Sequence, residues 1–271
     1  MKKFVLLLVA ALGLALLSVS PAGAQSGARI HLIHGIPNTA VDVEAGGSNV
    51  FTNFQFGQTQ DLSALAGNTL AGLKVKLAGT STVAIDAGNV ALPSSGNYTI
   101  IAHLDAAGAP KLTVFQNDTS TIAAGKGRLV VRHTAKAPAV DILAGGSPVF
   151  TNLTNPNEVK ADLAAGTVAA SVVPAGATTP VVIGPANLNV QAGSSLIVYA
   201  VGALDGSTLQ VLTESISGLG AAPTAVRTGN SPVESGSGIN GVLVGGLALL
   251  AAGVVGGLAL VASRRPARIE A

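Results

Sequence analysis

Hydrophobic and polar residues follow one another in short runs along most of this chain. Apolar runs of four to seven residues, dense in β-branched side chains, are separated by clusters of Gly, Pro, Asn and Ser. Such runs are typical of β-strands, because an amphipathic helix needs a longer apolar period of 3.6 residues without these breakers. The pattern therefore predicts an all-β protein.

The apolar runs predict seven strands in each half of the chain. In the first half they fall near residues 29–34, 40–44, 49–53, 73–77, 82–85, 97–103 and 111–116. In the second half they fall near residues 128–133, 139–143, 148–152, 167–173, 180–183, 195–201 and 208–213. Seven short strands in about 90 residues fit an immunoglobulin-like antiparallel β-sandwich, although the Cys and Trp of antibody domains are absent. We expect two such domains in tandem and a C-terminal transmembrane helix.

An internal repeat supports two copies of one unit. Residues 40–53 read AVDVEAGGSNVFTN, and residues 139–152 read AVDILAGGSPVFTN. In the first copy Val41 and Val43 alternate with polar residues, as in a half-buried strand, and Gly46-Gly47 can form a tight hairpin turn. A phosphate-binding loop is the alternative, but it needs a wider glycine spacing, a Lys and a following helix.

Both ends of the chain carry targeting patterns. Residues 1–24 combine two lysines, an apolar run and small final residues, which predicts a signal peptide cleaved near Ala24. Residues 241–262 are uncharged, and as a helix they would span about 33 Å, enough for a hydrocarbon core of about 30 Å. The basic tail, residues 263–271, then lies in the cytoplasm by the positive-inside rule. We expect a single-pass protein of the cell membrane with its N-terminal region outside.

The segment before the predicted membrane helix is rich in Gly, Ser and Pro. Residues 216–240 therefore predict a flexible stalk. Residues 225–229 end in Thr-Gly, as in a sortase signal, but the Leu and Pro of that signal are replaced, so sortase attachment to the wall stays an alternative to a permanent anchor. Gly-x-x-x-Gly spacings in the membrane helix would allow weak helix–helix self-association. The remaining boundaries place the sandwich repeats at residues 28–118 and 128–215, joined by a linker at 119–127.

The charge and composition of the chain argue against several classes of partner and site. Residues 25–240 contain ten basic and twelve acidic side chains, so the sequence pI near 9.0 comes from the two ends. Because a nucleic-acid site needs a basic patch on the folded part, we expect no nucleic-acid partner. The chain has no Cys, which excludes disulfides, thiol catalysis and Cys metal sites. Aromatic residues make up only 3%, which counts against sugar-stacking platforms.

One polar pair recurs in the two copies: a His followed eight residues later by an Asp. The pairs are His34 with Asp42 and His133 with Asp141. If their strands are neighbours, such a pair can orient a catalytic base or contribute to a metal site. A hydrolase triad, however, needs a placed Ser nucleophile, and zinc needs three or four ligands, which neither copy offers.

The parity of the first strand favours a structural role for these pairs. His34 shares its strand face with Ile30 and Leu32, so we expect it to lie at the apolar core and to hydrogen-bond locally. Contact with a ligand or metal and, last, catalysis are the alternatives. We predict no catalytic residue, no cofactor and no metal.

The same residues carry a resemblance to a known family. His34, Pro37, the strand Val41–Val43, the turn Gly46-Gly47 and the later element Gly96–Ile100 follow in the order of the bacterial cell-surface family called domain of unknown function 4397. The resemblance implies an extracytoplasmic β-sandwich module, often tandem and tethered to the membrane or wall. It implies no established activity.

The second copy resembles the family less closely. His133, Pro138 and Val140–Ile142 match, whereas Gly193–Ile197 lacks the Tyr of the later element. Together the matches run over about residues 28–215. The leading hypothesis is a non-enzymatic, membrane-anchored bacterial surface protein for envelope structure or contact with an unknown extracellular or envelope protein. A ligand-binding or adhesion module, for carbohydrate or an envelope partner, is the second hypothesis, and a hydrolase the third.

Overall fold

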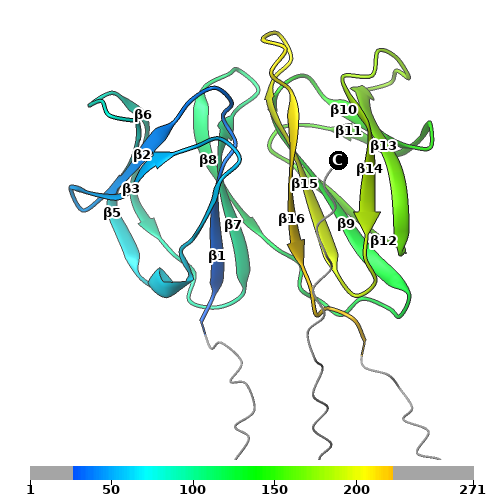
Figure 1. The fold of residues 1–271 in the computed structure, drawn as a ribbon, viewed down its shortest axis with the longest axis horizontal. Coiled ribbons are helices and arrows are strands. Elements are labelled where there is room, and N and C mark those ends of the chain that lie inside the picture. The colour runs from blue at the N-terminus through cyan, green and yellow to red at the C-terminus, as the bar shows by residue number, and fades with distance from the viewer. Residues whose placement is uncertain (1–26, 222–271) are drawn as a thin grey trace, which may run out of the picture. The chain divides into compact units, whose positions relative to one another are not determined.

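The computed structural model describes residues 27–221. Over this range sixteen strands form four sheets of four strands each, and the one helical element is the short 3-10 turn Ser63–Leu65 (Figure 1). The predicted all-β class is therefore confirmed.

The predicted signal peptide, membrane helix 241–262 and basic tail lie outside the described residues, as does most of the predicted stalk. No helix within residues 27–221 has the length and apolarity needed to cross a membrane.

The first repeat has two sheets. The first sheet has the order β4-β1-β7-β8 and the second the order β3-β2-β5-β6. The strands of the first sheet are β1 (Arg29–His34), β4 (Thr59–Asp61), β7 (Asn97–Leu104) and β8 (Pro110–Gln116). Those of the second are β2 (Val41–Ala45), β3 (Ser48–Phe54), β5 (Thr69–Leu77) and β6 (Val83–Ala91).

The second repeat has the same topology. Its sheets have the orders β12-β9-β15-β16 and β11-β10-β13-β14, which correspond strand for strand to those of the first repeat. The strands of the first sheet are β9 (Lys126–Lys136), β12 (Glu158–Ala164), β15 (Ser195–Ala203) and β16 (Gln210–Ile216). Those of the second are β10 (Val140–Ala144), β11 (Ser147–Leu153), β13 (Gly166–Pro174) and β14 (Ile183–Val190). The internal repeat in the sequence is thus a repeat of structure.

Three details differ from the prediction. Each repeat has eight strands rather than seven, because β4 and β12 are edge strands whose polar sequences show no apolar run. The strand expected at residues 180–183 is β14, which begins at Ile183 and turns Leu188 and Val190 toward the core. The sheets are also not purely antiparallel, since β1 pairs with β7, and β9 with β15, in parallel.

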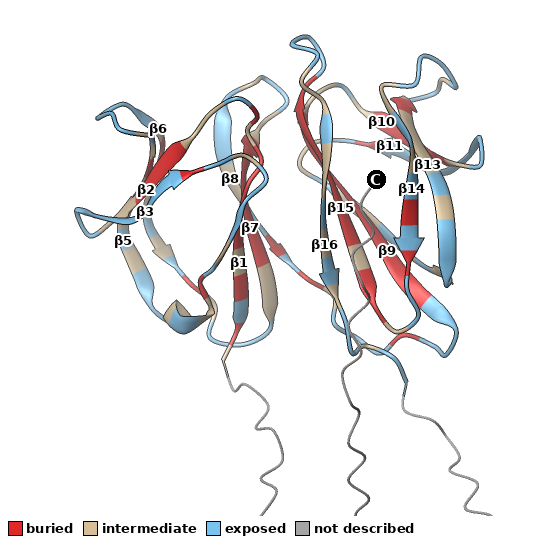
Figure 2. Cartoon of the chain, in the orientation of Figure 1, coloured by how far each residue is buried: buried red, intermediate tan, exposed pale blue. Residues whose placement is uncertain are grey.

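Each repeat has its own apolar core between its two sheets. In the first repeat it includes Val43 and Phe54, and in the second their counterparts Ile142 and Leu153. On β5 buried and exposed residues tend to alternate, as expected for a strand with one face in water. On β9 and β15 almost every residue is buried (Figure 2), so both faces of these strands are covered.

A third apolar cluster explains this burial. It joins Ile101 and Phe115 of the first repeat to Val130, Tyr199 and Val201 of the second. These side chains lie on the faces of the β1-β7-β8 and β9-β15 strands that point away from each repeat's own core. The two repeats therefore bury one sheet of each against the other, and the cores on either side of the contact stay separate.

Arg132 lies within this contact and is only 1% exposed. Its Nη1 donates to the Tyr199 hydroxyl at 2.7 Å, its Nη2 to Asn117 Oδ1 at 2.7 Å, and its Nε to Glu158 Oε2 at 2.8 Å. The guanidinium carbon also lies 4.2 Å from the centre of the Phe115 ring, in the geometry of a cation–π contact. One buried cation thus contacts both repeats and the segment that joins them.

Glu214, on β16, continues the polar contact toward the first repeat. Its Oε2 accepts hydrogen bonds from the hydroxyls of Tyr199 and Thr99, both at 2.8 Å, and its Oε1 lies 2.6 Å from His31 Nδ1. Buried charges are tolerated only when they are paired and hydrogen-bonded, and both conditions hold here. This network fixes the register of the two faces more narrowly than apolar packing alone would.

Replacing Arg132 tests whether this contact couples the repeats. Arg132→Ala leaves Glu158 and Asn117 without their buried partner and should lower the free energy of unfolding by about 3 kcal/mol. Scanning calorimetry should show one cooperative transition for the native chain and two, one per repeat, for the variant. Lys126→Ala, which removes an exposed cation from the same strand β9, is the matched control and should unfold like the native protein. A single transition at the native temperature in Arg132→Ala would contradict the coupling.

Candidate functional site

The repeated Gly-Gly strings form hairpin turns. Gly46 and Gly47 have φ values of 61° and 77° and connect β2 to β3, and Gly145 and Gly146 have φ values of 57° and 85° and connect β10 to β11. Two residues of positive φ are what a two-residue hairpin of the primed type requires. The prediction of a turn is confirmed.

Asp42 lies on β2 and is only 9% exposed. Its Oδ1 accepts the backbone N–H of Asn53 at 2.8 Å, and its Oδ2 accepts that of Gly79 at 3.0 Å. These two hydrogen bonds hold the pKa of Asp42 below its usual range, and the one from Asn53 has the larger effect. The carboxylate therefore joins β3 and the turn after β5 to the strand that carries it.

Asp141 makes the same two contacts in the second repeat. Its Oδ1 accepts the N–H of Asn152 at 2.8 Å, and its Oδ2 accepts that of Gly176 at 2.9 Å. Asn53 and Asn152 both have left-handed backbones, with φ values of 53° and 56°. Asn adopts this conformation more readily than most residues, so the repeated Phe-Thr-Asn string delivers its last N–H to the Asp.

The two repeated histidines lie at or near the ends of their strands, His34 on β1 and His133 on β9, and each closes the loop that follows its strand. His34 Nε2 donates to the carbonyl of Thr39 at 2.8 Å, and His133 Nε2 donates to that of Pro138 at 2.9 Å. Since a carbonyl only accepts, the proton of each ring lies on Nε2, and Nδ1 faces a backbone N–H at 3.4 Å, from Ile36 or Ala135. Both nitrogens of each ring thus have partners in the backbone.

In neither repeat does the His bind the Asp that follows it, because each side chain binds backbone groups instead. His34 and His133 are 0% and 2% exposed, and burial lowers the pKa of both imidazoles. Each Asp binds backbone N–H groups, and each His binds a backbone carbonyl. Within residues 27–221, no three His, Asp or Glu side chains are grouped as metal ligands. Whether these pairs contact a ligand stays a hypothesis.

His103 is a third buried histidine, which the repeat did not point to. Its Nδ1 donates to the carbonyl of Leu104 at 2.9 Å, and its Nε2 lies 2.8 Å from the hydroxyl of Thr113. Burial lowers its pKa as well. The second repeat has Val201 at the corresponding place on β15, so this histidine belongs to the first repeat only.

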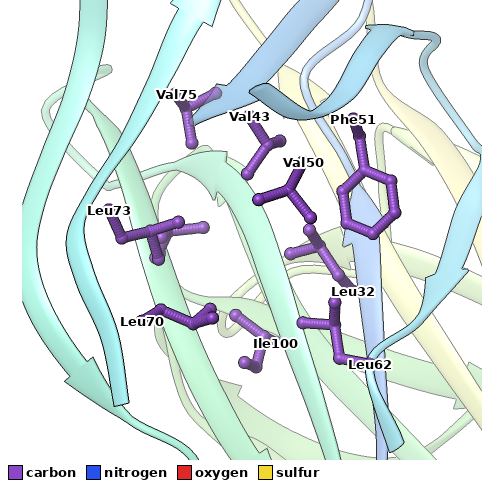
Figure 3. A pocket seen from close by; sticks show the side chains of 10 residues that line it. Leu32, Val43, Val50, Phe51, Leu62, Leu70, Leu73, Val75 and Ile100 are labelled. Carbon is purple, nitrogen blue, oxygen red and sulfur yellow. The ribbon is translucent and has the colours of Figure 1, made fainter. Parts of the chain in front are cut away.

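An apolar pocket opens between the two sheets of the first repeat (Figure 3). Val43, Val50, Phe51, Leu62 and Leu70 are among the side chains around it, and all of its lining residues are apolar. The corresponding opening of the second repeat is also lined by apolar residues alone and has a volume of about 420 Å³, whereas that of the first repeat has about 20 Å³. Specific binding pockets place a few polar groups to orient a ligand, and neither opening has a polar lining residue that could do so.

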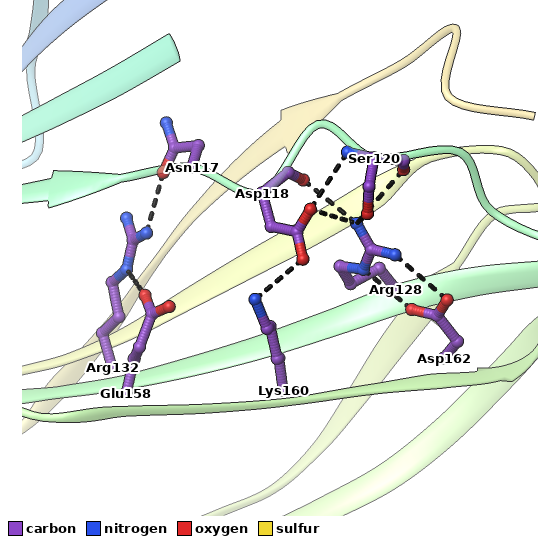
Figure 4. A network of polar contacts seen from close by, with 8 residues as sticks. All are labelled: Asn117, Asp118, Ser120, Arg128, Arg132, Glu158, Lys160 and Asp162. Atoms are coloured by element: carbon purple, nitrogen blue, oxygen red, sulfur yellow. Dashed lines mark hydrogen bonds and ion pairs between the residues drawn. The ribbon is translucent and has the colours of Figure 1, made fainter. Parts of the chain in front are cut away.

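A second polar cluster surrounds Arg128 at the start of β9 (Figure 4). Its guanidinium binds Asp162 through two bonds of 2.8 and 3.1 Å, and its Nη1 lies 3.0 Å from Asp118 Oδ1 and 3.1 Å from Ser120 Oγ. Lys160 adds a bond of 2.7 Å to Asp118 and, with Ser120, holds the pKa of that carboxyl far below its usual range. Asp162 in turn raises the pKa of Arg128.

This cluster fixes the segment between the repeats. The predicted linker contains Ser120, and Asp118 lies one residue before its predicted start. Both residues bind the second repeat through Arg128. Ile122 N also donates to Leu219 O at 2.7 Å, so the linker and the first residues of the predicted stalk lie against each other. Neither Arg128 nor Asp118 is recognisable as a site residue from the sequence alone, although Arg128 recurs as Arg29 in the first repeat.

The two-sheet architecture of the first repeat agrees with the β-sandwich module that the resemblance implies. Residues 28–143 match the family model described as domain of unknown function, DUF4397. The resemblance inferred from the sequence is thereby confirmed over residues 28–143, and over the rest of the second copy it stays a prediction. The DUF4397 match contains the whole first repeat, strand β9 and all but the last residue of β10. It assigns no activity. Among curated proteins, none matches this chain.

Removing one duplicated carboxylate tests its role in the fold. Asp141→Ala leaves the N–H groups of Asn152 and Gly176 without their partner and should lower the free energy of unfolding by about 2 kcal/mol. Asp205→Ala, on the same repeat, is the matched control, because Asp205 is exposed and pairs only with Lys136. Chemical denaturation of both variants measures the difference. Equal stability of the two would contradict a structural role for Asp141.

The buried histidines predict a dependence of stability on pH. Burial lowers the pKa of His34, His103 and His133 in the folded state, so below about pH 6.5 the unfolded chain binds protons that the folded chain does not. Stability should therefore fall on acidification from about pH 7 to pH 5, by at most about 1.4 kcal/mol per pH unit for each histidine.

His133→Gln should make this pH dependence shallower, because Gln cannot titrate and still offers an N–H to Pro138. Thermal denaturation at several pH values measures the slopes of the native chain and the variant. A native slope of zero between about pH 7 and pH 5, or an unchanged slope in His133→Gln, would contradict the assignment. A rise in melting temperature with divalent metal that disappears when His34 and His133 are both replaced by Asn would instead favour metal binding.

Proposed function

We propose that this protein is a non-enzymatic, membrane-anchored surface protein whose two β-sandwich repeats serve envelope structure or contact with another envelope protein. The signal-like N-terminus, the apolar segment 241–262 and the basic tail support the location. The DUF4397 match supports the module type and leaves the role open.

The contact between the repeats is the observation that carries this proposal. Independent modules joined by a flexible linker would need only polar outer faces. Here the two repeats are joined by four side chains, Phe115, Arg132, Tyr199 and Glu214. Holding two sandwiches in one fixed unit suits a protein that presents a defined surface to a partner. A flexible spacer would not require it.

The polar residues repeated in both copies support the same interpretation. Asp42 and Asp141 bind backbone N–H groups, and His34 and His133 bind backbone carbonyls. A general base must reach the proton that it abstracts, and these ring nitrogens are already engaged with the chain itself. Repetition of these residues thus follows from repetition of the fold.

Crosslinking on intact cells tests the proposal. A membrane-impermeant, amine-reactive crosslinker should react with exposed lysines such as Lys111 and Lys126 without lysis and should join the full chain to envelope protein. Truncation after Asn240 should release the labelled protein into the medium, because the proposed anchor follows that residue.

Reaction only after lysis would contradict the surface location. Esterase or glycosidase activity of the full chain that His34→Ala abolishes would contradict the non-enzymatic assignment. Mass spectrometry of the mature C-terminus separates the two modes of attachment, because an intact basic tail indicates a membrane anchor and its loss after residue 228 indicates a sortase.

A further inference from the structure

Arg29 and Arg128 occupy equivalent places in the two repeats. Arg29 begins the pairing of β1 with β7, opposite Asn97, and its N–H donates to Gly96 O at 2.9 Å. Arg128 lies opposite Ser195 on β15, and its N–H donates to Ser194 O at 2.9 Å. The backbone at these two positions therefore makes the same contacts.

The surroundings of the two side chains differ. Arg128 is 5% exposed and is enclosed by Asp162, Asp118 and Ser120. Arg29 is exposed, and among the described residues no carboxylate lies within salt-bridge distance of it. The arginine at this position thus has carboxylate partners in the second repeat and, among the described residues, none within salt-bridge distance in the first.

The register of the edge strands explains part of this difference. Asp162 on β12 lies directly opposite Arg128, whereas β4 ends at Asp61, which lies opposite His31 rather than Arg29. The Asp61 carboxylate instead accepts the N–H of Ser63 at 2.8 Å. Arg29 therefore has no cross-strand carboxylate of the kind that binds Arg128.

The segment that follows the last strand of each repeat explains the rest. After β8 the chain reads Asn117-Asp118-Thr119-Ser120, and this segment covers Arg128. After β16 it reads Ser217-Gly218-Leu219-Gly220, which carries no carboxylate. The second repeat thus shows which peptide this arginine position binds, and within residues 27–221 no such peptide lies at Arg29.

Arg29 lies in an open groove of about 570 Å³. Gly27, Asn97, Thr119 and Ser217 are among the residues that line it, so its walls offer amide, hydroxyl and backbone groups around one cation. Thr119 belongs to the segment whose neighbours bind Arg128. These groups include donors suited to a carboxylate.

We propose that the groove around Arg29 binds a carboxylate of an extended peptide segment of the Asp-x-Ser type, as residues 118–120 bind Arg128. The carboxylate accepts from the Arg29 guanidinium, and the hydroxyl of the segment lies beside it. The choice of a peptide as ligand rests on the proposed role in protein contact. The geometry of the groove does not depend on that role.

Peptide titration of the full chain in detergent tests this site. The probe is the blocked pentapeptide Asn-Asp-Thr-Ser-Thr, and nitrogen-15 NMR follows the Nε–H signal of Arg29 and the amide signals of Gly27 and Gly96. We expect these signals to shift together and Arg29→Gln to weaken binding by about tenfold, since hydrogen bonds to charged groups are the strong ones. Lys111→Gln removes the same charge from β8, away from the groove, and should bind like the native chain.

Three results would overturn the site: groove signals that do not move, equal binding by Arg29→Gln, or equal binding by a pentapeptide with Asn in place of Asp. Each of these can occur while crosslinking still places the protein at the cell surface, so failure of the groove is separable from failure of the proposed function. Weakening of binding at high salt would support the carboxylate–guanidinium contact, because such pairs are screened in open grooves.

Discussion

The arrangement of the two repeats depends on one buried cation, Arg132. Its guanidinium must be paired wherever it is buried, and its partners come from both repeats and from Asn117 between them. Apolar packing alone tolerates small shifts, because it has no direction, whereas three hydrogen bonds from one planar group do not. The contact therefore sets one relative placement of the sandwiches, and the groove around Arg29 exists only because that placement holds Thr119 and Ser217 beside it.

Duplication preserved the residues inside each repeat and changed those between them. Asp42 and Asp141 make the same two backbone contacts because both repeats need the same hairpin joined to the same turn. At the contact face, by contrast, Ile101 of the first repeat corresponds to Tyr199 of the second. If the two contact faces were identical, each residue would lie near its own counterpart. Because they differ, the first repeat contributes the apolar Ile101 and the second the hydroxyl donor Tyr199.

Much of the fold was predictable from the sequence, and the failures have physical causes. The strands with apolar cores, such as β1, lie where the pattern placed them, and the Gly-Gly turns lie where the repeat predicted them. The edge strands β4 and β12 were missed because an edge strand needs no apolar run. The repeated Asp was recognisable as a candidate, but its partners, the left-handed Asn53 and Asn152, were visible only as an unexplained Phe-Thr-Asn string.

By itself the sequence determined the all-β class, the duplication, the targeting patterns at the ends and the family of residues 28–143. These properties follow from local composition and from repetition, which need no knowledge of distant contacts. Only the tertiary structure decided that Arg128 is enclosed and Arg29 open, although the two arginines align in the sequence. The reason is that the pairing of a charged side chain depends on strand register and on segments from elsewhere in the chain. Neither can be deduced from the residues next to it in the sequence.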